Sequence, residues 1–343
     1  MRTAITFSEI HDRHTQPGHV ERPERLHAIR ALFEEDGILD TLLHLQHKPA
    51  TVEDVTLIHP REYYDRIESA VLAGGARLDP DTYATTGSLD VALEALGGLL
   101  TVTDAVLKGE ADNGFAIVRP PGHHARRDEA MGFCLFANVA IAAEKARQQE
   151  GIEKILIMDF DVHHGNGTQE IFYDDPDVMY MSTHQWPLYP GTGALEETGS
   201  GSAKGATVNI PLPARTGDAD YLKVFREILT PIALDFNPDL IFMSAGYDAH
   251  WMDPIAGMNL SVTGFADIIK EILMWAEKCT DHKVVALLEG GYNADALAHS
   301  VLTTARLLQD PSAIPSDPFG KPDRADENIT FFLEKLITFH GTG

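Results

Sequence analysis

Short apolar runs alternate with segments of helical periodicity along most of this 343-residue chain. The apolar runs occupy residues 115–118, 155–160, 178–182, 240–244 and 284–288. Segments between them, such as 138–151 and 264–279, repeat apolar residues every three or four positions, as amphipathic helices do, and Asn138 can cap the start of the first of them. Because strands buried on both faces appear as continuous apolar runs, this alternation predicts an α/β fold with an open, mostly parallel β-sheet flanked by helices.

The chain is long and apolar enough, with 44% hydrophobic residues, to form one large α/β domain or two smaller ones. It contains no internal repeat and no low-complexity tract, and no linker precedes about residue 310. We therefore expect a single domain over residues 1–343. Within it, residues 310–343 are expected to form an extended surface segment and a terminal helix that packs on the rest.

Each predicted strand is followed directly by a loop with an unusual composition. These loops are RPPGHHARRDEAMGF, DVHHGNG, THQWPLYPGTG, AGYDAHWMDP and EGGYNADAL, in chain order. In open α/β sheets, ligands bind beyond the carboxyl ends of the strands. We therefore expect the five loops to converge on one site at that edge of the sheet.

Three side chains that can bind a metal alternate at the end of the 155–160 run. Side chains two residues apart on an extended chain point the same way, so Asp159, Asp161 and His163 can face one ion. Catalytic zinc commonly takes three protein ligands, and Asp248, just after the 240–244 run, can supply another. From one loop alone, helix capping or hydrogen bonding to loop backbone explains these residues as well as metal binding does.

The charge balance excludes one class of function and leaves another open. There are 27 Lys and Arg against 52 Asp and Glu, a formal net charge of -25 that disfavours direct nucleic-acid binding and attracts cationic substrates.

The start of the chain lacks the apolar stretch of a signal peptide, and no run of about 18 apolar residues predicts a membrane span. The two cysteines, Cys134 and Cys279, show no disulfide or zinc-ribbon spacing. We expect a cytoplasmic protein.

Taken together, the motifs resemble those of the zinc-dependent histone deacetylase family. The matching stretches are HVERPERL, RPPGHHARRDEAMGFCLFANVAIAA, MDFDVHHGNGTQEIF, HQWPLYPGTG, SAGYDAH and LLEGGYN, which run in the family's order from residue 19 to about residue 300. The resemblance implies the arginase-deacetylase fold and one zinc ion per chain, or iron(II). It also implies a K⁺ site and removal of acyl groups from acylated lysine or related amines.

The resemblance also assigns roles to individual residues. It implies zinc ligands at Asp161, His163 and Asp248, and catalytic roles for His123, His124, Tyr292 and Asp159, with His124 as general base and then acid. The implied substrate tunnel comprises Phe133, Tyr189, Gly290, Ile255 and, at the rim, Asp81, with Asp79 as an alternative for that last place. The implied monovalent cation site uses Asp159, Asp161, His163 and Ser182, and Arg25 is placed near a product channel.

The same residues also bear on other functions that this fold supports. Binuclear manganese ureohydrolases of this fold need carboxylates where this chain has Gly165 and His250, which favours a single zinc ion. A non-catalytic module that binds acylated lysine is disfavoured because the full catalytic set is present. Acetylpolyamine deacetylase activity stays open. One polyamine-selective branch of the family has an acidic gatekeeper residue at the position where this chain has Ile255, but rim loops or a dimer partner can also set selectivity. The acyl-chain preference and the oligomeric state are not readable from the sequence.

Overall fold

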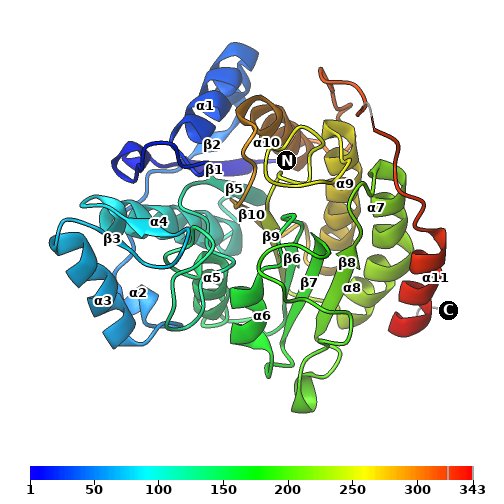
Figure 1. The fold of residues 1–343 in the computed structure, drawn as a ribbon, viewed down its shortest axis with the longest axis horizontal. Coiled ribbons are helices and arrows are strands. Elements are labelled where there is room, and N and C mark those ends of the chain that lie inside the picture. The colour runs from blue at the N-terminus through cyan, green and yellow to red at the C-terminus, as the bar shows by residue number, and fades with distance from the viewer. Residues whose placement is uncertain (323, 342–343) are drawn as a thin grey trace.

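A parallel β-sheet of eight strands forms the centre of the protein (Figure 1). The computed structural model describes residues 1–322 and 324–341. The strands are β1 (Thr3–Phe7), β2 (Leu43–His44), β5 (Asn113–Ile117), β6 (Ile155–Asp159), β7 (Val178–Gln185), β8 (Thr207–Leu212), β9 (Leu240–Ala245) and β10 (Val284–Leu288). Their order in the sheet is β2-β1-β5-β10-β9-β6-β7-β8, and all neighbouring pairs are parallel. The prediction of an open, mostly parallel sheet flanked by helices is confirmed.

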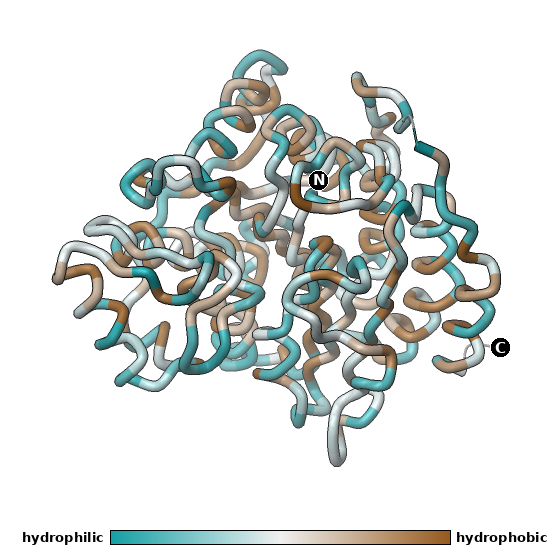
Figure 2. The backbone as a smooth tube through the Cα atoms, viewed as in Figure 1, coloured by the Kyte–Doolittle hydropathy of each residue, from teal (hydrophilic) through white to brown (hydrophobic). Residues whose placement is uncertain are grey.

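Helices cover both faces of this sheet, and each face has its own hydrophobic core. Alternate residues of β6 show the division. Leu156 and Met158 belong to the core under α1 (Glu24–Asp36), α9 (Val262–Cys279) and α10 (Ala294–Gln309). Ile155 and Ile157 belong to the core under α3 (Arg61–Leu72), α4 (Ser88–Leu107) and α5 (Asn138–Ala146). This alternation follows from the period of two along a strand. Figure 2 shows the hydrophobic residues concentrated in the strands and in the helix sides that face them, with hydrophilic residues on the outer turns and loops.

The helices differ in length from the predicted segments. Their bounds are α1 (Glu24–Asp36), α2 (Val52–Val55), α3 (Arg61–Leu72), α4 (Ser88–Leu107), α5 (Asn138–Ala146), α6 (Asn166–Phe172), α7 (Asp218–Val224), α8 (Thr230–Phe236), α9 (Val262–Cys279), α10 (Ala294–Gln309) and α11 (Thr330–His340). The short 3₁₀ turns are η1 (His11–Arg13), η2 (Ile38–Thr41) and η3 (Gly201–Ala203). The π-helical turn η4 (Phe225–Leu229) joins α7 to α8. β3 (Ala76–Arg77) pairs with β4 (Tyr83–Ala84) in a separate hairpin.

One expected helix cap is wrong. The sequence suggested that Asn138 caps the helix after the GHH loop, but Asn138 is already helical and its side-chain amide donates to the Pro120 carbonyl at 3.3 Å. By contrast, α9 has a side-chain cap, because Ser261 accepts a hydrogen bond from the Gly264 amide. The Asn138 side chain therefore ties the start of α5 to the GHH loop instead of satisfying the helix terminus.

The final stretch contains one helix. α11 lies beside α7 and α8 (Figure 1), and its Leu333 and Leu336 side chains are buried in the core under α9. The described part of residues 310–329 holds no helix or strand; Asp323 and residues 342–343 lie outside the described residues. Within the part of the chain that is described, no helix has the length and apolarity needed to cross a membrane.

A buried ion cluster fixes the segment between β1 and α1. Arg119 is fully buried and donates two hydrogen bonds to Glu21, from Nε to Oε1 at 2.7 Å and from Nη2 to Oε2 at 2.5 Å. Arg25, also buried, donates to the same carboxylate at 3.1 Å. Burial acts to raise the pKa of Glu21, but the charges and hydrogen bonds of the two arginines outweigh it and lower that pKa to about 2. Glu21 therefore carries its negative charge between two buried cations.

We expect Glu21→Gln to lower the free energy of unfolding by about 3–5 kcal/mol at neutral pH, because two buried guanidinium groups lose their counter-ion. Urea unfolding of wild type and variant measures this difference. The folded-state pKa of Glu21 is lowered, so its contribution is present above about pH 4.5 and is lost as the pH falls toward 2. The stability difference should shrink over that window, and a difference that persists unchanged below pH 3 would contradict this assignment.

Candidate active site

Asp161, His163 and Asp248 converge where β6 and β9 end. All three side chains are buried, and they offer ligand atoms that lie within 4.8 Å of one another. His163 Nδ1 is 3.1 Å from Asp161 Oδ1 and 3.1 Å from Asp248 Oδ2. β6 and β9 are neighbouring parallel strands, so residues just beyond their carboxyl ends meet although they are far apart in sequence.

Two glycines make room for this cluster. A Cβ on Gly246 would lie 2.0 Å from Asp161 Oδ2, and a Cβ on Gly290 would lie 2.3 Å from Asp248 Oδ2. The Gly290 amide also donates to Asp161 Oδ2 at 2.8 Å, while the Val162 amide donates to Asp248 Oδ1 at 2.8 Å. Asp161 Oδ1 and Asp248 Oδ2 are the oxygens directed at the His163 ring, and Asp161 Oδ1 also accepts the His163 amide at 2.9 Å.

The donor set fits a divalent metal ion. The two distances of 3.1 Å are close to the separation of about 3.3 Å between ligands of a tetrahedral site with bonds of 2.0–2.1 Å. Among the described residues, no lysine or arginine forms an ion pair with Asp161 or Asp248. Burial and the nearby charge of Asp161 raise the pKa of Asp248, and a bound cation would relieve both costs.

His123 forms a buried ion pair behind the cluster. Its Nδ1 lies 3.0 Å from Asp159 Oδ2, and its Nε2 lies 3.9 Å from Asp161 Oδ1. Burial disfavours the charged imidazole, but the carboxylates of Asp159 and Asp161 outweigh burial and raise the pKa of His123 to about 10. Tyr180 donates a hydrogen bond to the same Asp159 oxygen at 3.1 Å. His123 therefore holds a positive charge next to the candidate metal ligands.

His124 is neutral by contrast. Its Nδ1 lies 2.8 Å from the side-chain oxygen of Asn166, an acceptor, so Nδ1 carries the proton and Nε2 has a free lone pair. Burial and the positive charge of His123 hold the pKa of His124 well below its usual value. Because the ring also lines the cavity described below, His124 is placed to accept a proton there.

A cavity of about 220 Å³ opens onto this cluster. Its lining residues are Asp81, His124, Gly132, Phe133, His163, Leu188, Tyr189, Ile255 and Tyr292. Tyr189 stands edge-on to His124, with ring centroids 5.2 Å apart, and Phe133 stands edge-on to Tyr292 at 5.8 Å. Five predicted tunnel or catalytic side chains, those of Asp81, Phe133, Tyr189, Ile255 and Tyr292, therefore share one space with His124 and His163.

The mouth of this cavity is acidic. Asp79 Oδ1 accepts the Asp81 amide at 2.8 Å, and burial, followed by the hydrogen bond and charge of Asp79, raises the pKa of Asp81 to about 6. The Thr82 hydroxyl next to this pair accepts the Phe133 amide at 2.9 Å. Phe133 itself has a positive φ of 69°, which is uncommon for an aromatic residue and sets its ring as a cavity wall.

The remaining predicted residues lie around the cavity and do not line it. Gly290 supports the candidate ligands from behind, as described above. Ser182 faces Asp159 across the β6–β7 pair and contacts His184 Nδ1 at 2.9 Å. Arg25 donates to the carbonyls of Gly291 and Glu289 at 2.7 and 2.5 Å, and its guanidinium lies 5.0 Å from the Tyr292 ring centroid.

Two carboxylates that the sequence reasoning missed hold the loops that carry the candidate site residues. Glu289 is fully buried, and its Oε2 accepts the amides of Gly122 and His123 at 2.7 and 3.3 Å. Asp253 accepts the Tyr292 amide at 2.8 Å. The only available signal was their position, Glu289 directly after an apolar strand and Asp253 inside the AGYDAHWMDP loop.

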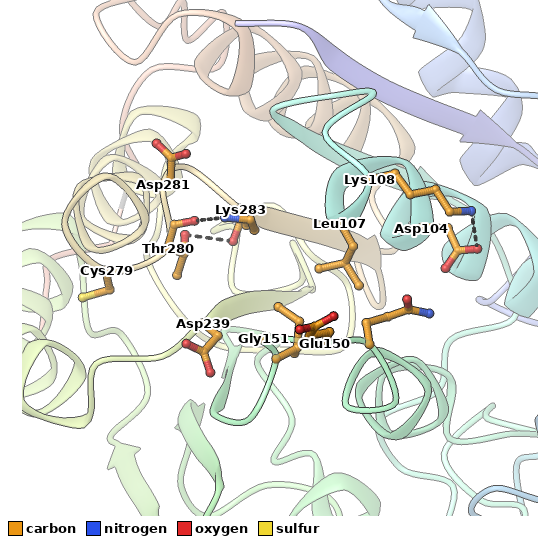
Figure 3. A pocket seen from close by; sticks show the side chains of 12 residues that line it. Asp104, Leu107, Lys108, Glu150, Gly151, Asp239, Cys279, Thr280, Asp281 and Lys283 are labelled. Atoms are coloured by element: carbon orange, nitrogen blue, oxygen red, sulfur yellow. Dashed lines mark hydrogen bonds and ion pairs between the residues drawn. The ribbon is translucent and has the colours of Figure 1, made fainter.

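A larger cavity of about 420 Å³ lies at the opposite, amino-terminal edge of the sheet. Asp239 and Lys283, which precede β9 and β10, line it together with Asp104 from α4 and Lys108 just after that helix (Figure 3). Several polar groups there bond to one another; Lys108 reaches Asp104 at 3.3 Å, for example. None of the predicted site residues lines this cavity, so its chemistry does not match the motifs although it is larger.

Comparisons with known proteins agree with the motifs. A family model described as the histone deacetylase domain matches residues 19–308. A probable deacetylase from Archaeoglobus fulgidus is 45% identical over 298 residues, which is 86% of this chain and 82% of that protein. The human polyamine deacetylase HDAC10 is 38% identical over 328 residues, 90% of this chain and 48% of its own length. The crystal structure of the HDA15 HD domain superimposes with a TM-score of 0.85 at 36% identity, covering 90% of this chain and 91% of that one.

Proposed function

Because the chain belongs to the histone deacetylase family, we propose that it is a zinc-dependent amidohydrolase that removes acetyl or other acyl groups from acylated lysine side chains. Deacetylase or amidohydrolase activity and the arginase-deacetylase fold follow from the family and from the similarity to the HDA15 HD domain. The observation that carries the finer proposal is that a cluster of three metal-capable side chains reaches, through His163, a cavity that a neutral histidine and a tyrosine also line. We further propose one K⁺ at the site formed by Asp159, Asp161, His163 and Ser182, a single domain and a cytoplasmic location.

The metal and the histidines have separate tasks in this proposal. When bound at Asp161, His163 and Asp248, zinc supplies a Lewis acid that polarises a carbonyl and acidifies water. His124 Nε2 takes a proton from the attacking water and later returns it to the leaving amine, while Asn166 holds the ring in the required tautomer. His123, charged by its pairing with Asp159, stabilises negative charge that develops on the substrate.

Tyr292 supplies a hydrogen-bond donor for the substrate carbonyl oxygen in this proposal. Its ring lies between Phe133 and Arg25, and Asp253 fixes its backbone, so its hydroxyl enters the cavity in a defined orientation. Burial and the charge of Asp248 raise the pKa of Tyr292 well above its ordinary value, so the hydroxyl stays protonated and donates to the substrate carbonyl oxygen. The donor strengthens as that oxygen becomes negative.

We expect Tyr292→Phe to lower kcat by at least about a hundredfold, since one oxyanion donor is lost while ring packing is retained. Steady-state hydrolysis of an acetyl-lysine peptide measures the change. Zinc content and thermal unfolding midpoint serve as controls and should match wild type, because the hydroxyl has no structural hydrogen bond among those described. A kcat within tenfold of wild type would remove Tyr292 from the mechanism.

The proposed activity is tested by kcat/KM of the zinc-loaded protein on an acetyl-lysine peptide and on an acetylated polyamine, side by side. Preference for the peptide supports a lysine deacetylase. Preference for the polyamine supports the second candidate, an acetylpolyamine deacetylase, which the acidic Asp79–Asp81 rim and the relative named as a polyamine deacetylase favour. Binding of acylated lysine without turnover of either substrate would leave only the non-catalytic module.

Ile255 offers a direct test of selectivity at the rim. Its apolar side chain lines the cavity and provides no counter-charge for the distant ammonium of a polyamine. We expect Ile255→Glu to raise the ratio of kcat/KM for polyamine over peptide by about tenfold, the effect of about 1.4 kcal/mol. Ile255→Gln, similar in size but uncharged, is the matched control, and an equal change in both variants would show that charge is not the cause.

A further inference from the structure

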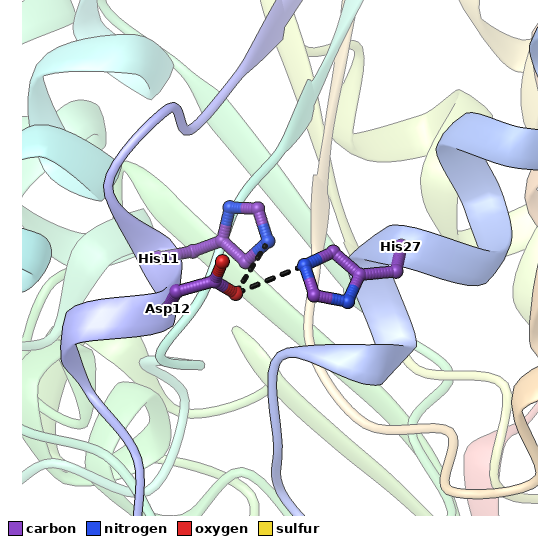
Figure 4. Close-up of side chains that lie close together, drawn as sticks. All are labelled: His11, Asp12 and His27. Atoms are coloured by element: carbon purple, nitrogen blue, oxygen red, sulfur yellow. Dashed lines mark ion pairs between the residues drawn. The ribbon is translucent and has the colours of Figure 1, made fainter.

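His11, Asp12 and His27 form a second cluster of metal-capable side chains, in a different part of the molecule from the catalytic ligands. His11 and Asp12 belong to η1, which follows β1, and His27 lies in α1 (Figure 4). One oxygen, Asp12 Oδ1, lies 2.9 Å from His27 Nε2 and 3.4 Å from His11 Nε2. As Figure 4 shows, both imidazole rings direct a nitrogen at this carboxylate.

The tautomer of His11 makes its contact with Asp12 unfavourable for a neutral ring. His11 Nδ1 lies 2.8 Å from the Ser8 carbonyl, which can only accept, so Nδ1 carries the ring proton. Nε2 then has a lone pair, and this buried atom has no hydrogen-bond partner among the described residues. A lone pair and a carboxylate oxygen therefore face each other at 3.4 Å, an arrangement that needs a cation between them.

A second proton on His11, placed on Nε2, would satisfy the contact with Asp12 less well than a metal ion. His11 is 8% exposed, so a charged ring at this place would lose most of its hydration. Arg119 also donates to the His11 carbonyl at 2.5 Å, which brings a permanent positive charge to the same turn. A metal ion satisfies the Nε2 lone pair without requiring a buried imidazolium.

The spacing of the three atoms suits a metal. In a tetrahedral site with bonds of 2.0–2.1 Å, neighbouring ligand atoms are about 3.3 Å apart, and the two distances to Asp12 Oδ1 lie on either side of this value. The side chains of Asp12 and His27 are 65% and 53% exposed, so water can complete the coordination. This resembles the spacing of the candidate ligands in the active site, where both contacts to His163 are 3.1 Å.

We propose that His11, Asp12 and His27 bind a second divalent transition-metal ion of the zinc class. Two imidazoles and one carboxylate favour Zn²⁺, Co²⁺, Ni²⁺ or Cu²⁺ over Mg²⁺ and Ca²⁺, which prefer oxygen ligands. The ion joins η1 to α1 and thereby fixes the segment whose Glu21 and carbonyl groups surround Arg119. Its role is structural, because the residues that bind it do not line the catalytic cavity.

The test is equilibrium dialysis of the zinc-loaded protein against Co²⁺, with bound metals counted by elemental analysis. Wild type should hold two divalent ions per chain, whereas His27→Ala and Asp12→Asn should hold one and keep their deacetylase activity. His44→Ala removes another exposed histidine that belongs to no cluster of this kind among the described residues, and this variant should still hold two ions. Added Co²⁺ should also raise the thermal unfolding midpoint of wild type more than that of His27→Ala.

Two results would overturn the proposal. One is a single bound ion in wild type, which would mean that the cluster is only an ion pair between His27 and Asp12. The other is two ions in both wild type and His27→Ala, which would place the second ion elsewhere. His27→Gln keeps the length and polarity of the side chain and replaces His27→Ala in the same measurement if the alanine variant does not fold.

Discussion

Replacing His124 by alanine is expected to lower kcat on an acetyl-lysine peptide by about a hundredfold to ten-thousandfold, the range typical for loss of a general base. The structure gives this residue the features that the role needs. Asn166 accepts from Nδ1, Nε2 has a free lone pair, and the ring lines the cavity beside His163 and Tyr189. Burial and the positive charge of His123 hold its pKa well below the usual value, so the ring is neutral before the reaction.

Measuring kcat, zinc content and the thermal unfolding midpoint of His124→Ala together distinguishes a loss of catalysis from damage to the site. His124 is not among the three candidate metal ligands, so His124→Ala should keep its active-site zinc. The cavity left by the ring adjoins an open space, and the thermal unfolding midpoint should change little. A variant that turns over at a near-normal rate would transfer the base role to another group, whereas loss of zinc would make His124 part of the metal site.

The central strands could be predicted from the sequence because they are buried on both faces. The run 284–288 coincides with β10, and 240–244 falls one residue short of β9; every residue of both strands is buried. The strands β1, β2 and β8 were missed. β2 has only two residues, and β8 contains Asn209 and Pro211, residue types that strands disfavour. Pro211 is tolerated because β8 is an edge strand of the sheet.

The candidate metal ligands could be predicted because each stands directly beyond a recognisable strand. Parallel strands bring their carboxyl ends to one edge, so the motif alone was enough to place Asp161 and Asp248 together. Their separation from His163, 3.1 Å in both cases, required the structure. The same reasoning could not find Glu289 or Asp253 as supports, because they act by accepting backbone amides of other loops, and such contacts leave no periodic pattern.

The His11–Asp12–His27 cluster shows a further limit of the sequence. A turn and the first half of a helix meet there, and only the contact of His11 with the Ser8 carbonyl reveals which nitrogen lacks a proton. Tautomers follow from hydrogen-bond partners, which composition and spacing do not determine. The buried Glu21 between two arginines is similar: HVERPERL was recognised as a motif, but the role of Glu21 within it appears only in the fold.

Replacing Asp248 by alanine is expected to empty the active-site metal position and to reduce hydrolysis to background. Asp248 provides one of only two carboxylates in the candidate set, and an alanine leaves Asp161 and His163 as two ligands where catalytic zinc commonly takes three. Elemental analysis of protein that also carries His27→Ala counts this site alone, since the second proposed site is then absent. The zinc content should fall from one ion per chain to near zero.

A matched variant separates metal binding from loop structure at Asp248. Asp248 Oδ1 also accepts the Val162 amide at 2.8 Å, so alanine removes a buried hydrogen bond as well as a ligand. Asp248→Asn keeps an acceptor for Val162 but removes the negative charge that opposes the charge of the ion. We therefore expect the asparagine variant to lose most of its zinc while unfolding closer to the wild-type midpoint than the alanine variant does. Unchanged zinc in Asp248→Ala would exclude this residue as a ligand, and with it the three-residue site from which the proposed reaction proceeds.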